Sequence, residues 1–170
     1  PPTILFDDAL AIAGGDLTLQ LFATPGHTSD HIAIFIPQIA TLLAGDAAEL
    51  PFPFVESAST IPQMRASLER MAALNPAVAL YCHAPVTSGP KALEQNIAYF
   101  ATLEHHCRAA LAQGAPARPP ADADVEVLVS FPYAAAVPIE LDAEALAGFY
   151  RPGHQAAIRM MLEYLDGSSA

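Results

Sequence analysis

Apolar and polar residues alternate along the first third of the chain, and this period of two is typical of β-strands. Over residues 17–23 an apolar side chain stands at every second position, which predicts a strand with one face toward a core. Residues 32–36 are almost wholly apolar and predict a strand covered on both faces. A third strand is predicted over 40–44. The short turns between the three predict an antiparallel meander.

The pattern then changes to the period of an α-helix. Residues 60–74 place four large apolar side chains on one stripe, namely Met64, Leu68, Met71 and Leu74. Ser59 or Thr60 is suited to cap this helix, and the Asn75-Pro76 pair ends it. The following apolar run, 77–81, predicts another buried strand. Before the meander, residues 1–6 predict a short edge strand and residues 7–16 a loop.

The last part of the chain is predicted to be mainly helical. A long amphipathic helix is expected over 89–113, where Gly114 stops it. Residues 115–123 are rich in proline and predict a hinge. We therefore divide the chain into a first domain over 1–114, this hinge, and a helical appendage over 124–170.

Within the appendage, residues 124–130 are compatible with a short helix, although 125–131 fits a strand equally well. Two further helices are expected over 142–149 and 152–165, with Pro152 in the first turn of the second. His154 is then expected to pack or to cap near that helix start. His105 and His106 are adjacent on the long helix and do not face one another, so we interpret them as surface residues.

Composition limits the kinds of partner. The chain has 170 residues, a net charge of −11 and a single lysine, Lys91, which argues against binding to nucleic acid or to an anionic membrane surface. No apolar run is long enough to span a bilayer. Cys82 and Cys107 form no recognisable disulfide framework, and Cys82 is expected at the end of a buried strand, which favours a reducing, cytoplasmic location.

Three polar residues stand where strands end. His27 follows Pro25 and Gly26 in a sharply bent loop, where it suits a metal ligand, a catalytic base or a turn cap equally well. Asp46 follows the third strand, where a Gly-Asp pair often forms only a turn. His83 follows the strand 77–81, where a histidine is often a satisfied core residue. The loop 47–59, rich in proline and phenylalanine, either walls a substrate pocket or packs on itself.

The motifs Thr24-Pro25-Gly26-His27-Thr28, Leu42-Leu43-Ala44-Gly45-Asp46 and Tyr81-Cys82-His83-Ala84-Pro85 occur in this order. Together they resemble the second half of hydrolases with the metallo-β-lactamase fold, including glyoxalase-II-like members. Cys82 and Ala84 depart from the glycine-rich context that is usual in the family. The resemblance implies an α/β (α+β) fold class, as the C-terminal half of an αββα sandwich with a small helical C-terminal appendage.

The resemblance also implies a metal site. His27 would complete the ligands of a first metal ion, Asp46 would bridge two ions, and His83 would bind the second. Two zinc ions are expected, although iron or manganese suits the same ligands. Water held between two metals loses a proton near neutral pH and attacks an ester, thioester, lactone or related bond of a small-molecule substrate.

The family's upstream motif, His-x-His-x-Asp-His, does not occur in this sequence. A half of the fold by itself would leave one face of its sheet in water. We therefore expect the N-terminal half of the same fold as a partner, on a separate or cleaved chain, or else a homodimer. The alternative hypothesis is a non-catalytic interaction module that has lost the metal site.

Overall fold

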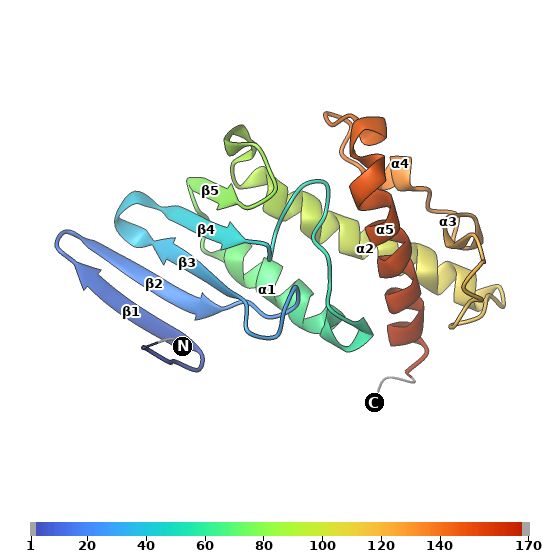
Figure 1. Cartoon of the computed structure of the whole chain (residues 1–170), viewed down its shortest axis with the longest axis horizontal. Coiled ribbons are helices and arrows are strands. Elements are labelled where there is room, and N and C mark those ends of the chain that lie inside the picture. The colour runs from blue at the N-terminus through green and yellow to red at the C-terminus, as the bar shows by residue number, and fades with distance from the viewer. Residues whose placement is uncertain (1–2, 168–170) are drawn as a thin grey trace.

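The structure, a computed structural model, describes residues 3–167 and has a five-stranded sheet at one end (Figure 1). The strands lie side by side in chain order, and only the last pair, β4 and β5, is parallel. They are β1 (Ala9–Gly14), β2 (Leu17–Ala23), β3 (Ile32–Ile36), β4 (Thr41–Gly45) and β5 (Val78–Tyr81). The predicted antiparallel meander is confirmed as β2, β3 and β4.

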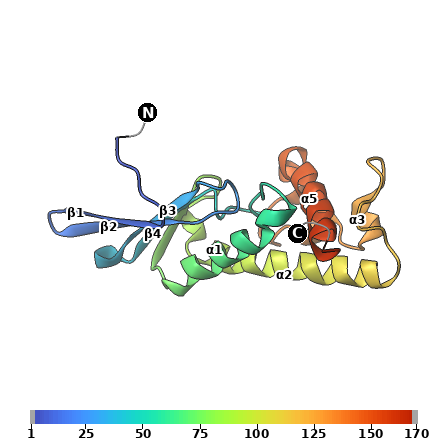
Figure 2. The same ribbon diagram turned by 90° about the horizontal axis from the view of Figure 1, so that it is seen from below.

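Two helices cover one face of this sheet, and the C-terminal helices pack beyond its edge (Figure 2). The helices are α1 (Ile61–Ala73), α2 (Lys91–Ala112), α3 (Val125–Leu128), α4 (Tyr133–Ala136) and α5 (Ala143–Leu165). Single turns of 3₁₀-helix occur at Pro37–Ile39, Ala58–Thr60 and Val86–Ser88. Because β4 and β5 are parallel, the chain must cross over between them, and α1 lies in that crossover.

The core lies between the sheet and helices α1 and α2. Phe22 and Ala33 are paired across β2 and β3, Leu42 and Ala79 across β4 and β5, and all four are buried on the helix side. The predicted stripe of α1 meets them, and its residue Met64 is fully buried, as are Leu68 and Met71. The sheet and α1 therefore form the frame from which the strand ends project.

The N-terminal prediction was wrong. The first strand is β1, within the span predicted as a loop, whereas residues 3–6 form no strand; Pro1 and Pro2 lie outside the described residues. Alanines alternate with Leu10 and Ile12 along β1, and these two pair with Leu21 and Leu19 of β2. Alanine is small and has a low preference for β-strands, so the alternation of alanine with Leu10 and Ile12 did not predict a strand.

The C-terminal helix was also predicted incorrectly. One continuous helix, α5, runs through Pro152, which lies in its interior and not in its first turn. The buried positions Tyr150, His154, Ala157 and Ile158 keep a helical spacing across the proline. Burial of this stripe outweighs the backbone hydrogen bond that the proline removes.

Buried aromatic residues join the C-terminal helix α5 to α2. His154 is fully buried in mid-helix, with Nδ1 3.1 Å from the Tyr99 hydroxyl and Nε2 2.9 Å from the Phe131 carbonyl oxygen. His154 therefore packs, as expected, but caps no helix start. His106 stacks on Phe131 with ring centroids 4.8 Å apart, so it is not the surface residue that was predicted, whereas His105 is exposed.

Residues 125–128 form a single helical turn, α3, in which Asp124 accepts a hydrogen bond from the Val127 amide. The alternative prediction, a strand over 125–131, was therefore wrong. The segment 115–123 has carbonyl oxygens that accept hydrogen bonds from the Arg159 guanidinium of α5. The division into a domain, hinge and appendage stays a prediction.

Within residues 3–167 no helix combines the length and the apolar character needed to cross a membrane. Cys82, which is exposed, and Cys107, which is buried, are both free thiols. The cytoplasmic location stays a prediction.

Candidate metal centre

The loop between β2 and β3 is held tightly against α1. Gly26 lies so close to this helix that a Cβ at position 26 would stand 2.5 Å from the Met64 Cα atom, which only glycine avoids. The Ser67 hydroxyl donates to the Pro25 carbonyl oxygen at 2.8 Å. These two contacts fix the bend from which His27 projects.

His27 is oriented by its own ring hydrogen bond. Its Nδ1 lies 3.2 Å from the Phe54 carbonyl oxygen. Because a carbonyl only accepts, Nδ1 carries the proton and Nε2 is left with its lone pair. A metal-binding histidine commonly has this arrangement, in which one nitrogen is held by a backbone carbonyl and the other binds the ion.

His31, the first residue after the loop, holds the backbone at Asp46. Its Nε2 accepts from the Asp46 amide at 3.1 Å, and its Nδ1 lies 2.7 Å from the buried Thr24 hydroxyl. Burial and the neighbouring His27 lower the pKa of His31, which favours the neutral ring that accepting this amide hydrogen requires. Gly45 leaves room for the approach, because a Cβ there would stand 2.8 Å from the His31 Nε2.

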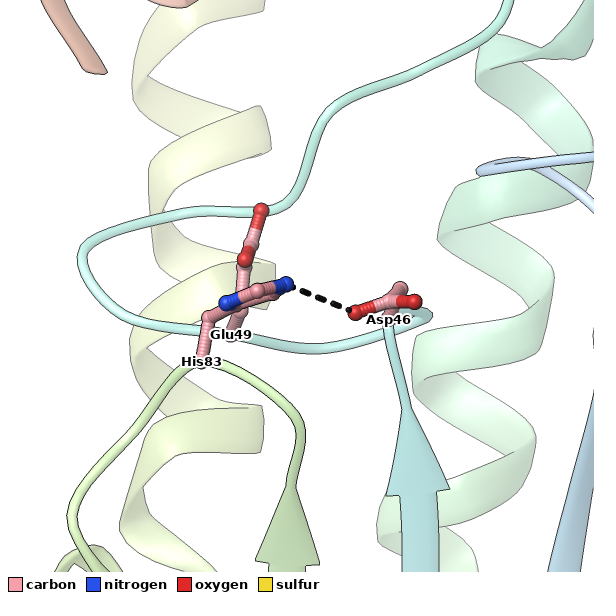
Figure 3. Close-up of side chains that lie close together, drawn as sticks. All are labelled: Asp46, Glu49 and His83. Carbon is pink, nitrogen blue, oxygen red and sulfur yellow. Dashed lines mark ion pairs between the residues drawn. The ribbon is translucent and has the colours of Figure 1, made fainter. Parts of the chain in front are cut away.

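Asp46 and His83 follow adjacent parallel strands, so their side chains meet at one edge of the sheet. The His83 Nε2 lies 3.4 Å from the Asp46 Oδ1 (Figure 3). This oxygen is buried, and among the described residues it has no hydrogen-bond partner. Two of the three residues predicted from the motifs are therefore in contact.

Glu49 is the third residue at this point and was not predicted. It lies in the loop after β4, and one carboxylate oxygen of Glu49, one of Asp46 and one ring nitrogen of His83 all lie within 4.8 Å of one another. Burial, followed by the charge of Asp46, raises the pKa of Glu49 to about 7. A charged residue in the otherwise apolar run Ala47-Ala48-Glu49-Leu50-Pro51-Phe52 was the signal available in the sequence.

His27 is not a member of this three-residue group within the part of the chain that the structure describes. It lies on the neighbouring loop with its ring centroid 6.3 Å from that of His31. His31 in turn bonds the Asp46 amide. The role of His27 as a ligand stays a prediction.

The donor set fits a divalent cation. Two carboxylates and one imidazole are common ligands of zinc, iron and manganese, and all three also accept water as a further ligand. Asp46 and Glu49 each have a buried oxygen that finds no hydrogen-bond partner within residues 3–167. A buried carboxylate oxygen without a partner is costly in a folded protein, and a bound cation would remove that cost.

Comparisons with known proteins agree with this geometry. Residues 1–83 match the family model described as the metallo-beta-lactamase superfamily. A stretch of 40 residues is 42% identical to the Beta-lactamase-like protein 2 homolog of Caenorhabditis elegans, covering 24% of this chain and 14% of that protein.

Solved structures share the fold over nearly the whole chain. A metallo-beta-lactamase family protein from Thermus thermophilus has a TM-score of 0.61 at 23% identity, covering 100% of this chain and 51% of that one. A beta-lactamase domain protein from Burkholderia ambifaria has a TM-score of 0.62 at 18% identity, covering 98% and 47%. The chain thus spans about half the length of these two structures.

The family model covers all five strands together with Asp46 and His83, and the solved relatives share the arrangement of sheet and helices. This chain has the metallo-β-lactamase fold, and its residues 1–83, which include Asp46 and His83, match the metallo-beta-lactamase superfamily.

Proposed function

We propose that this chain is part of a metal-dependent hydrolase that cleaves an ester, thioester, lactone or related bond in a small molecule. The observation that supports the proposal most strongly is the meeting of the Asp46 carboxylate and the His83 imidazole, 3.4 Å apart, at the ends of two adjacent strands. A bound divalent cation supplies Lewis acidity and lowers the pKa of water near it. Zinc is the expected metal, with iron and manganese compatible with the same ligands.

The chain's own residues hold the site in position for this chemistry. Asp46 supplies an anionic ligand on a backbone that His31 fixes. His27 presents an Nε2 lone pair, since its Nδ1 proton is engaged by the Phe54 carbonyl oxygen. In a site with two ions, Asp46 is the proposed bridging ligand, because a short carboxylate can bind one cation with each oxygen.

The sheet face opposite the helices supports a completing segment. The strand register gathers aliphatic residues on this face, namely Leu10, Ile12, Leu17, Leu19, Leu21, Ile32, Ile34, Ile36, Leu43, Val78 and Leu80. Five of them are exposed, including Ile12 at 41% and Val78 at 42%, and Figure 2 shows α1 and α2 on the other side. Covering each 100 Å² of apolar surface stabilises by about 2.5 kcal/mol.

We therefore also propose that the N-terminal half of this fold, on a separate or cleaved chain, packs on this aliphatic face and completes the site. A second copy of the chain is the other candidate partner. The same face also favours the alternative function, a non-catalytic interaction module, because an apolar binding surface needs no metal.

Metal content and hydrolysis distinguish the two functions. The purified protein, with any bound partner, is stripped of metal and reloaded with zinc, and then tested on a generic thioester and a lactone. The expected result is bound zinc and hydrolysis in the wild type, with both lost in Asp46→Asn. A protein that binds its partner normally but takes up no zinc would refute the enzyme and support the interaction module.

A further inference from the structure

The side chain of Glu49 is unusual among the buried carboxylates of this chain. It is 1% exposed, yet its Oε1 atom has no hydrogen-bond partner among the described residues. Glu126 is also buried, at 4% exposed, but its carboxylate is fully hydrogen-bonded, as buried carboxylates usually are. It accepts four hydrogen bonds, two from Arg151, one from Gln155 and one from the Tyr133 amide. A carboxylate buried only for structural reasons is expected to resemble Glu126 and not Glu49.

The backbone of Glu49 is held rigidly by α2. The Asn96 side chain is fully buried and contacts both backbone groups of Glu49. Its Oδ1 accepts from the Glu49 amide at 3.0 Å, and its Nδ2 donates to the Glu49 carbonyl oxygen at 2.7 Å. The position of Glu49 is therefore fixed by two hydrogen bonds before any ligand is considered.

The other carboxylate oxygen of Glu49 is held by the C-terminal helix. The Tyr150 hydroxyl of α5 lies 3.4 Å from the Glu49 Oε2. Tyr150 is itself buried and packs edge-on against Phe52 in the same loop, with ring centroids 5.9 Å apart. This contact occupies Oε2 and leaves Oε1 as the atom available to a ligand.

We propose that Glu49, held by Tyr150 of the C-terminal helix, is a third protein ligand for a divalent cation bound by Asp46 and His83. The proposal rests on the proposed function, since it assigns an additional ligand to the same metal centre. Two ligand atoms of a tetrahedral zinc site stand about 3.3–3.5 Å apart. The Asp46 and His83 atoms already have this separation at 3.4 Å, and the Glu49 oxygen lies within 4.8 Å of both. Small side-chain rotations are therefore enough to close the site.

The appendage thereby becomes part of the metal centre. Tyr150 is a positioning residue, because it acts on the cation only through Glu49. A hydrogen bond to a ligating carboxylate typically changes metal affinity by about 10- to 100-fold. Tyr99 offers a matched control, since its hydroxyl belongs to the same aromatic cluster but lies 3.1 Å from the His154 Nδ1, away from the Glu49 carboxylate that Tyr150 contacts.

The test is equilibrium dialysis of the metal-stripped protein, together with any bound partner, against zinc and, separately, manganese, with circular dichroism to verify folding. Glu49→Gln is expected to weaken binding by at least tenfold, Tyr150→Phe by about tenfold, and Tyr99→Phe by less than twofold. Unchanged affinity in both Glu49→Gln and Tyr150→Phe overturns the role of Glu49 as a ligand. In that case loss of binding in Asp46→Asn still supports the proposed function, whereas no binding by the wild type overturns both.

If Glu49→Gln does not fold, Tyr150→Phe decides the matter, because it leaves the carboxylate in place. Weaker binding in Tyr150→Phe than in Tyr99→Phe supports the proposal, and equal affinities of these two variants overturn it.

Discussion

The Glu126 carboxylate joins α3 to α5 within the appendage, and its low pKa allows a quantitative test. Glu126, in the short helix α3, accepts hydrogen bonds from Arg151 and Gln155 of α5. Burial by itself would raise the pKa of Glu126, but the Arg151 and Gln155 side chains and the Tyr133 amide together lower it to about 2. We predict that Glu126→Gln destabilises the protein at pH 7 and that this effect decreases in acid.

The magnitude follows from proton linkage. The difference between an ordinary pKa of 4.5 and a pKa of about 2 corresponds to about 3 kcal/mol of stability at pH 7. This is an upper value, because the Arg151 side chain is 54% exposed and water screens its charge. A lowered carboxylate pKa stabilises the fold above the unfolded-state pKa, and this stability is lost as the pH falls toward 2. The difference between wild type and variant should shrink by about 1 kcal/mol between pH 7 and pH 3.5.

Urea unfolding of the two proteins at pH 7 and pH 3.5 measures this difference directly. Glu69→Gln serves as the control, because it removes the same charge from an exposed position on α1. It is expected to change the free energy of unfolding by less than about 0.5 kcal/mol at both pH values. A Glu126→Gln effect that is below about 0.5 kcal/mol at pH 7, or that grows in acid, would refute this reasoning.

Two further predictions concern packing and buried hydrogen bonds. Gly153→Ala is expected to destabilise the protein by about 1–3 kcal/mol, because the new Cβ would stand 1.9 Å from the Phe54 ring. The control is Gly148→Ala on the same helix. A Cβ at position 148 has nothing within 4 Å, so this variant should be neutral or stabilising. Thermal unfolding of both checks this, and equal effects contradict it. Asn96→Ala leaves two buried backbone groups of Glu49 without partners and is expected to cost about 2–5 kcal/mol in urea unfolding. A cost below about 1 kcal/mol shows that these hydrogen bonds are not needed.

The sequence was most informative about the site where short motifs occur in a recognisable order along the chain. Asp46 and His83 were identified from the motifs that resemble the metallo-β-lactamase family, because a position directly after an apolar strand fits a turn or a core residue as well. The parallel pairing of β4 and β5 brings the two side chains together. His31 was not predicted as a site residue, because its two hydrogen bonds, to Thr24 and to Asp46, depend on the folded loop.

Glu49 was missed because long-range contacts define its role. Its partners, Asn96 and Tyr150, are 47 and 101 residues away in the chain, and no local spacing connects them. The break predicted at Pro152 shows the opposite error, in which a sound local rule was overruled by tertiary burial.

Anomalous diffraction at the zinc edge, from crystals of the zinc-loaded protein, would locate the cation itself. We predict an anomalous peak within bonding distance of the Asp46 and His83 side chains. A fully loaded crystal with its anomalous peaks elsewhere, and none between these two side chains, would contradict the metal centre.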